Sequence, residues 1–238
     1  NKATATITAQ SRALTYNGKT QSFKAGYSVS GLVNRETATS ALSGVTIVNT
    51  ITGKNAGFYG VSSTGSAQNY DLKLVGGLTI NKANATVIAN NKTVTYNGFT
   101  QSVSGFTVKG LVNGEKSSVL SAVTTTGGSG KDAGRYDLTV TGSDQTYNLS
   151  FVNGALTINK ANAKVIANSK TVTYNGQLQS VTGFTVQGLV GNDTASVLTG
   201  ITTTGGIGTQ VGKYPLIASG SDKNYKLTFV KGGLTIKR

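Results

Sequence analysis

The stretch TVTYNG occurs at Thr93–Gly98 and again at Thr171–Gly176, and a close relative, ALTYNG, occurs at Ala13–Gly18. Two other short motifs recur with nearly the same spacing. NKA begins at Asn1, Asn81 and Asn159, and LTI begins at Leu78, Leu156 and Leu234. These shifts of 78 to 80 residues extend along the whole chain. They predict three tandem repeats, residues 1–80, 81–158 and 159–238.

The length of the repeat indicates how the chain buries its apolar residues. Solenoid and propeller repeats are usually about 20 to 50 residues long and cannot bury a core alone. A repeat of 78 to 80 residues lies near the lower size limit for a self-sufficient core without disulfides. We therefore expect three small domains, each with its own interior.

The composition excludes most kinds of chemistry. The 238 residues include no Cys, His, Met or Trp. Disulfides, thiolate or imidazole metal sites and Ser-His or Cys-His nucleophiles are therefore excluded. The acids form no recurring pair, so we expect no enzyme, no cofactor, and no catalytic, cofactor-binding or metal-binding residues. A calcium site made of Asp132, Asp137 and Asp144, which cluster only in the second repeat, is the alternative.

The third repeat illustrates the expected strands. Alternating apolar residues predict strands at 161–168, 171–174, 183–188, 201–206, 212–219 and 225–236. Ala163, Val165 and Ala167 are expected on one side of the first of these strands. Val172 and Tyr174 are expected to point inward from the second.

Turn and helix signals separate these strands. Asn175 and Gly176 predict a tight hairpin turn, because both residues tolerate positive φ. The period of two breaks down over residues 189–200, where Asn192 or Asp193 is expected to cap a short helix that ends at Gly200. The expected repeat is a mainly antiparallel sheet with one short helix. A seven-strand sandwich of the immunoglobulin type remains the alternative.

Two kinds of residue recur at matching positions. Glu36, Glu115 and Asp193 are the carboxylates common to all three repeats, and negative charge in the first turn of a helix is favoured by about 0.3 to 1 kcal/mol. We interpret them as helix-capping residues. Nine of the ten tyrosines fall in three columns: Tyr16, Tyr96 and Tyr174; Tyr59, Tyr136 and Tyr214; Tyr70, Tyr147 and Tyr225. We interpret these tyrosines as core residues rather than as a ligand-stacking surface.

The joints between repeats are short. About three or four residues, centred on residues 81–84, separate the last expected strand of one repeat from the first strand of the next. A joint of this length without a Gly- or Ser-rich run does not behave as a random coil. We therefore expect the repeats to form a semi-rigid, elongated rod.

The formal net charge of +14 suggests the class of partner. The 22 basic residues are spread along the chain, whereas a nucleic-acid site concentrates them on one element. We expect no specific nucleic acid, and no membrane insertion, because no window approaches the roughly 20 apolar residues of a membrane helix. Polysaccharides and anionic cell-surface glycans are the expected partners. The third repeat, with nine basic and two acidic residues, is the first candidate.

Four motifs in the same order resemble a known family. Each repeat contains YNG, GLV followed by an acid three residues after the valine, a glycine two residues before a tyrosine, and GxLTI. This pattern resembles the MBG, or mostly β-grasp, repeats of large bacterial surface and secreted adhesins, including the filamentous-haemagglutinin type exported by a two-partner outer-membrane route. The resemblance implies three tandem β-grasp-like domains and an extracellular or cell-surface location. It supplies no ligand.

The first repeat departs most from the shared pattern. Ala67 stands where the other repeats have Asp144 and Asp222. This difference argues against a site common to the three repeats at that position.

Taken together, the sequence features favour a structural stalk, a monomeric fragment of a much larger adhesin that projects a binding region and supports adhesion or biofilm formation. The alternative is that the repeats themselves bind polysaccharide through basic strand faces.

Overall fold

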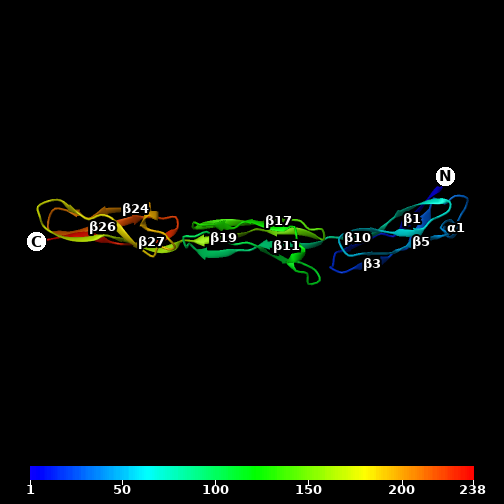
Figure 1. Ribbon diagram of the computed structural model, residues 1–238, viewed down its shortest axis with the longest axis horizontal. Coiled ribbons are helices and arrows are strands. Elements are labelled where there is room, and N and C mark those ends of the chain that lie inside the picture. Colours follow the sequence, from blue (N-terminus) through cyan, green and yellow to red (C-terminus); the bar gives the residue numbers. More distant parts are fainter. The chain divides into compact units, whose positions relative to one another are not determined.

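The structure is a computed structural model that describes residues 1–238, and it is almost entirely β (Figure 1). The strands of the first repeat are β1 (Ala3–Ala9), β2 (Arg12–Thr15), β3 (Gln21–Lys24), β4 (Tyr27–Ser30), β5 (Val45–Val48), β6 (Thr50–Gly53), β7 (Gly57–Gly60), β8 (Ser62–Gly65), β9 (Tyr70–Val75) and β10 (Gly77–Asn81). The predicted mostly-β class is confirmed.

The second and third repeats contain nine strands each. Those of the second are β11 (Ala83–Ala89), β12 (Lys92–Thr95), β13 (Gln101–Ser102), β14 (Phe106–Lys109), β15 (Val123–Gly127), β16 (Ser129–Gly130), β17 (Gly134–Gly142), β18 (Tyr147–Val152) and β19 (Gly154–Asn159). Those of the third are β20 (Ala161–Ala167), β21 (Ser169–Thr173), β22 (Gln179–Ser180), β23 (Phe184–Gln187), β24 (Ile201–Gly205), β25 (Ile207–Gly208), β26 (Gly212–Gly220), β27 (Tyr225–Val230) and β28 (Gly232–Lys237).

The contacts divide the chain into two compact units, and the division runs through the second repeat. Unit 1 comprises residues 1–88, 106–124 and 140–152, and unit 2 comprises residues 89–105, 125–139 and 153–238. Each unit thus contains one complete junction between neighbouring repeats. The repeat boundaries at 80 and 158 remain predictions about how the chain folds.

Each repeat distributes its strands over separate sheets. In the first repeat one sheet has the order β4-β1-β9 and another has the order β2-β10-β7. In the third repeat the corresponding orders are β23-β20-β27 and β21-β28-β26-β24. Consecutive strands such as β1 and β2 therefore lie in different sheets, which is the arrangement that the sandwich alternative describes.

Most strand pairs are antiparallel, as predicted, but the first and last strands of a repeat pair in parallel. β1 pairs with β9 and β2 with β10, and in the third repeat β20 pairs with β27 and β21 with β28. These parallel pairs join strands that are far apart in the repeat. Periodicity reports which face of a strand is buried but not its partner, so the sequence did not indicate them.

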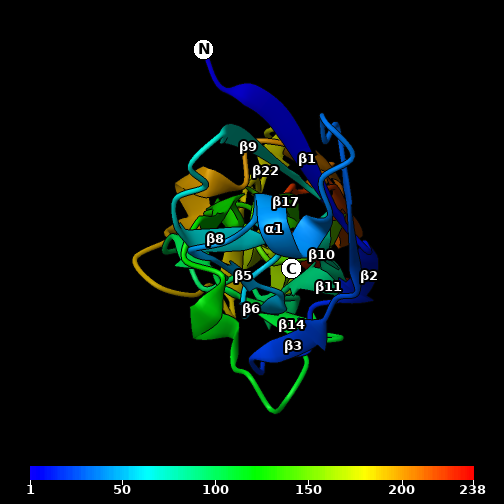
Figure 2. The ribbon, with the colours of Figure 1, turned by 90° about the vertical axis from the view of Figure 1, so that its right-hand side faces the viewer.

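The helical segments are shorter than expected. α1 (Ala38–Ala41) is the one α-helix, and the other repeats have single 3₁₀ turns, η1 (Ser117–Val119) and η2 (Ala195–Val197). Ala41 of α1 belongs to one buried cluster with Ala5 of β1 and Tyr70 of β9. Figure 2 shows the α1 ribbon on the side that faces the viewer. None of these helical segments has the length and apolar character of a membrane span.

The predicted hairpin turn at YNG is wrong. β21 ends before this turn and pairs with β28, while β22 follows it and pairs with β25. The turn therefore joins strands with different partners. Gly176 has φ of 77°, and the side chain of Asn175 accepts a hydrogen bond of 3.0 Å from the Gln177 N–H. This Asx turn requires left-handed backbone at the glycine.

One predicted tyrosine column covers glycines. The rings of Tyr59, Tyr136 and Tyr214 lie against Gly53, Gly130 and Gly208, where a Cβ atom at the glycine would approach ring carbons to 2.1–2.3 Å. Each hydroxyl donates to the carbonyl four residues earlier, at 2.9–3.0 Å. The glycine is thus required by the ring that covers it.

The apolar core of unit 2 crosses its junction. One cluster of buried residues includes Leu156 and Ile158 of β19 together with Val165 of β20 and Leu234 of β28. Only Lys160 separates β19 from β20, and only Lys82 separates β10 from β11. The expected joint of three or four residues is therefore wrong. The same cluster contacts both repeats at the junction, and the expectation that each repeat folds around its own interior stays a prediction.

Candidate functional site at the repeat junctions

In unit 1, the carboxylate of Glu115 joins tyrosines from two repeats. Tyr16, just after β2, donates its hydroxyl to Oε1 of Glu115 at 2.5 Å. Tyr147, the first residue of β18, donates to Oε2 of the same carboxylate at 2.5 Å. Tyr16 belongs to the first repeat, and Glu115 and Tyr147 belong to the second. Hydrogen bonds to a charged acceptor are roughly twice as strong as neutral ones.

Unit 2 repeats the arrangement at its own junction. Tyr96 of the second repeat and Tyr225 of the third donate their hydroxyls to Oδ2 of Asp193, at 2.8 and 2.7 Å. We call the two arrangements junction clusters: Tyr16, Glu115 and Tyr147 in unit 1, and Tyr96, Asp193 and Tyr225 in unit 2. The aspartate side chain is shorter than that of glutamate, and both tyrosines donate to the same one of its oxygens.

The rings in each junction cluster also contact each other. Tyr16 and Tyr147 meet edge to face, with centroids 5.5 Å apart, and Tyr96 and Tyr225 do the same at 5.4 Å. All four tyrosines are buried. An edge-to-face aromatic pair contributes about 0.5 to 1.5 kcal/mol beyond the burial of its area.

Backbone contacts support each cluster. The tyrosine hydroxyls of Tyr147 and Tyr225 accept hydrogen bonds of 3.0 Å from the N–H groups of Val112 and Val190. These bonds fix the loop that carries the carboxylate. The N–H of Tyr16 donates to the carbonyl of Asn81, and the N–H of Tyr96 to that of Asn159, both at 2.8 Å.

The interpretation of the shared acids as helix caps is wrong. η2 begins after Thr194, which makes no side-chain capping bond, and Asp193 binds the tyrosines instead. Glu36 likewise accepts from the hydroxyl of Tyr70 at 2.5 Å rather than capping α1, whose cap is Thr37. Buried tyrosine hydroxyls need acceptors, so the tyrosine and acid columns were a signal when taken together.

The lysine of the NKA motif at each joint binds a loop of the repeat that follows the joint. Lys82 donates its Nζ to the carbonyl of Asp144 at 2.6 Å, and Lys160 donates to the carbonyl of Asp222 at 2.6 Å. The side chain of Asp144 accepts from the N–H groups of Thr146 and Tyr147. The turn held by Asp144 thus leads directly into β18, whose first residue is Tyr147.

Unit 2 has a second polar contact across its junction. Asp132 of the second repeat accepts from Nζ of Lys223 at 2.7 Å and from Nδ2 of Asn224 at 3.0 Å. The Asn224 side chain in turn accepts from the N–H of Ala133 at 2.8 Å. The bond to Lys223 lowers the pKa of Asp132, and this pair raises the pKa of Lys223.

The three acids of the hypothesised calcium site have separate roles. Asp132 binds Lys223 and Asn224, Asp137 pairs with Arg135 at 2.9 Å, and Asp144 holds its own turn. No group of three acids in the structure is arranged to hold a metal ion. The carboxylates thus serve local hydrogen bonds.

Residues 85–157 and 163–235 each match the sequence family described as the MBG domain, YGX type. Together the two matches cover more than half of the chain. The chain belongs to the MBG domain family. The family resemblance inferred from the motifs is confirmed, and the junction cluster of unit 2 lies between the two matched MBG domains.

Solved structures add no argument about function. The three N-terminal domains of the bacteriophage RB49 highly immunogenic outer capsid protein are 13% identical over 99% of this chain and 100% of that one, with a TM-score of 0.26. The eight N-terminal Ig domains of Down Syndrome Cell Adhesion Molecule are 12% identical over 100% of this chain and 42% of that one, with a TM-score of 0.26. Sidekick-1 immunoglobulin domains 1–5 are 11% identical over 99% of this chain and 61% of that one, with a TM-score of 0.27. No curated protein matches the chain.

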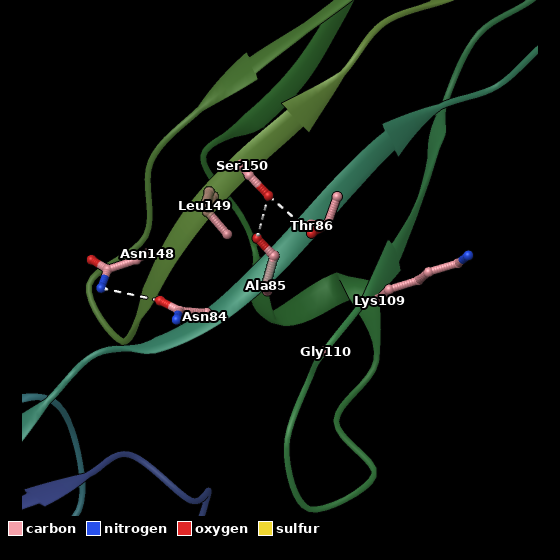
Figure 3. Close-up of a pocket in the computed structure, with 8 residues that line it drawn as sticks. All are labelled: Asn84, Ala85, Thr86, Lys109, Gly110, Asn148, Leu149 and Ser150. Atoms are coloured by element: carbon pink, nitrogen blue, oxygen red, sulfur yellow. Dashed lines mark hydrogen bonds between the residues drawn. The ribbon is translucent and has the colours of Figure 1, made fainter.

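The hollows on the MBG repeats are open rather than enclosed. One of about 480 Å³ lies over the parallel pair β11 and β18 (Figure 3). Hydrogen bonds cross it from Asn148 to Asn84 at 3.4 Å and between Thr86 and Ser150 at 2.9 Å. Lys109 points away from these groups in Figure 3. The amide and hydroxyl side chains that line the hollow thus already bond to one another.

The clusters predict a fall in stability at high pH. Burial, together with the bond to Glu115, raises the pKa of Tyr16 to about 12 and also that of Tyr147 to about 12. An unfolded tyrosine ionises near pH 10, so between about pH 10 and 12 the unfolded chain binds fewer protons than the folded one. The free energy of unfolding must therefore fall as the pH rises through this range.

Denaturant unfolding at pH values on either side of 10 measures this effect. The stability that the clusters contribute is complete below about pH 10 and lost as the pH passes 12. The variant Tyr16→Phe is expected to lose less stability than the unchanged chain over the same interval. An equal loss in both proteins contradicts the assignment to this tyrosine.

Proposed function

We propose that the chain is a non-catalytic structural segment of a bacterial cell-surface or secreted adhesin, a stalk that projects a binding region and supports cell adhesion or biofilm formation. Membership of the MBG family supports a surface-associated repeat protein. Export of the filamentous-haemagglutinin type remains a prediction from the sequence resemblance.

The junction clusters are the observation that supports this proposal. At each junction a single lysine links the strands, a carboxylate accepts from tyrosines of both repeats, and the tyrosine rings pack together. One residue cannot act as a flexible coil between two folded parts. Neighbouring repeats held in this way suit a spacer better than a hinged string of domains.

The strand pairing also suits a chain under tension. In the third repeat the first strands, β20 and β21, pair in parallel with the last strands, β27 and β28. A pull on the two ends of this repeat acts along the paired strands, so several hydrogen bonds must break together. A stalk that holds a surface contact under load needs this resistance.

Small-angle X-ray scattering of the full chain tests the stalk. Three repeats placed end to end extend on the order of 100 Å, which corresponds to a radius of gyration of about 30 Å. A compact globule of this chain length has a radius of gyration of about 18 Å. A radius of gyration of about 18 Å refutes the stalk.

A second candidate function is binding of anionic polysaccharide, which one hollow in the third repeat favours. Lys170, Lys213 and Lys231 line this hollow of about 460 Å³, and no acid lines it. Sulfate or carboxylate groups of a glycan are attracted to such a cluster of positive charge.

Retention on a heparin column measures this binding. The triple variant Lys170→Gln, Lys213→Gln and Lys231→Gln is expected to elute at lower salt than a control with Lys19→Gln, Lys24→Gln and Lys54→Gln, which loses the same charge from the first repeat. Equal elution of the two variants assigns retention to net charge alone and removes the hollow as a site.

A further inference from the structure

The junctions of the two units differ in the polar contact that crosses them. At the junction of unit 2, Asp132 accepts from Lys223 at 2.7 Å and from Asn224 at 3.0 Å. The cluster tyrosines and the joint lysine are common to both junctions, and the cluster acid differs only in length. The residues of unit 1 at the positions of the polar contact are Asn55, Gln145 and Thr146.

These three residues do not bond across the junction of unit 1. Thr146 donates its hydroxyl to Oδ1 of Asp144 in its own turn, at 2.7 Å. The side chains of Asn55 and Gln145 are exposed and make no hydrogen bond. The loop of Asn55 is nevertheless held like its equivalent in the second repeat, because the Tyr59 hydroxyl donates to the Asn55 carbonyl at 3.0 Å. Two amides on a fixed backbone therefore remain available to a ligand.

A hollow of about 670 Å³ lies at this junction, and residues of both repeats line it. Its lining includes Tyr16 and Asn55 of the first repeat, Lys82 of the joint, and Glu115 and Gln145 of the second repeat. The volume falls within the range of about 300 to 1,000 Å³ that is usual for small-molecule sites. One small ligand in this hollow contacts both repeats.

The charged groups of the hollow already have partners within the protein. Glu115 accepts from two tyrosine hydroxyls, Asp144 accepts from the backbone of its own turn, and Lys82 donates to the Asp144 carbonyl. Two carboxylates and one lysine do not attract an anionic glycan, unlike the three lysines of the hollow in the third repeat. The amides of Asn55 and Gln145 are neutral, and each both donates and accepts hydrogen bonds.

We propose that the hollow at the junction of unit 1 binds a neutral saccharide, with one hexose unit in contact with both Asn55 and Gln145. A sugar hydroxyl donates one hydrogen bond and accepts others, so a ring with several hydroxyls pairs with both amides at once. The saccharide then joins the two repeats, as the bond between Asp132 and Lys223 joins those of unit 2. The site goes beyond the stalk and is separate from the candidate site for anionic polysaccharide.

Chemical-shift titration of the isotope-labelled full chain measures this binding. The probes are the methyl glycosides of glucose, galactose, mannose and N-acetylglucosamine, each added to about 50 mM. At least one probe is expected to shift the backbone amide signals of Asn55 and of residues 143–146. The expected dissociation constant is about 1 to 10 mM, because a few exposed hydrogen bonds bind weakly. The absence of such shifts with all four probes overturns the proposal.

A triple variant closes the hollow with the side chains that cross the junction of unit 2. Asn55→Asp, Gln145→Lys and Thr146→Asn together leave the net charge unchanged and are expected to weaken binding at least about tenfold. The matched control, Asp132→Asn, Lys223→Gln and Asn224→Thr, makes the reverse exchange in unit 2 and leaves binding at unit 1 unchanged. Equal affinity of the two triple variants overturns the assignment to this hollow.

The single variant Gln145→Ala tests the site without a new contact across the junction. The Gln145 side chain is exposed and makes no hydrogen bond, so its removal leaves the fold as it is. Binding is expected to weaken about three- to tenfold, through the loss of one hydrogen bond to the sugar. Gln68→Ala, at the equivalent position of the first repeat, is the control and leaves binding unchanged. Equal effects of the two variants contradict the proposal, and the stalk is tested separately by scattering without sugar.

Discussion

Replacing Glu115 by alanine is expected to lower the free energy of unfolding by about 2 to 5 kcal/mol. The substitution removes the acceptor of two buried tyrosine hydroxyls, Tyr16 and Tyr147, and each buried donor left without a partner costs about 1 to 3 kcal/mol. Denaturant unfolding of the full chain measures the change.

Glu36→Ala is the matched control for this prediction. Glu36 is the same residue type at the equivalent position, but it accepts from Tyr70 alone. Its replacement is expected to cost about 1 to 3 kcal/mol, less than the replacement of Glu115. Equal losses from the two variants mean that the bond across the junction contributes nothing.

Gly130→Ala is expected to destabilise the chain by about 2 to 3 kcal/mol. The new Cβ atom would lie 2.1 Å from the Tyr136 ring, and this ring is held by a hydroxyl bond to the carbonyl of Asp132 at 2.9 Å. Overpacking of this kind forces side chains from their preferred rotamers. The φ angle of Gly130 is not positive, so the backbone itself tolerates alanine.

The control for Gly130→Ala removes the ring. In a chain that already carries Tyr136→Ala, the methyl group has room, and Gly130→Ala is expected to change the stability by less than about 0.5 kcal/mol. A similar cost with and without the ring places the strain elsewhere, in the backbone or in another neighbour.

The repeats, and the face of each strand that is buried, could be predicted from the sequence. Ala163, Val165 and Ala167 are all buried, as their alternation predicted. Alternation works because the side-chain period of a strand is two regardless of which strand it pairs with. It does not identify that partner, and the parallel pairing of β20 with β27 was therefore missed.

The junctions were harder to predict because their signals are relations between distant residues. Asp193 lies 97 residues after Tyr96 and 32 residues before Tyr225, and local sequence gave it the usual role of an acid beside a short helix. The tyrosine column was correctly assigned to buried positions for Tyr16 and Tyr96. Tyr174 was expected to point inward but is 45% exposed. The cluster that buries such a tyrosine needs a carboxylate from the next repeat.

The most direct test of the junction clusters is a double-mutant cycle between Tyr96→Phe and Asp193→Ala, measured by denaturant unfolding of the full chain. These residues belong to neighbouring repeats and meet through one hydroxyl bond of 2.8 Å. The account predicts a coupling energy of about 1 to 2 kcal/mol. Losses that add to within about 0.5 kcal/mol contradict it, because the two repeats are then energetically independent at this contact.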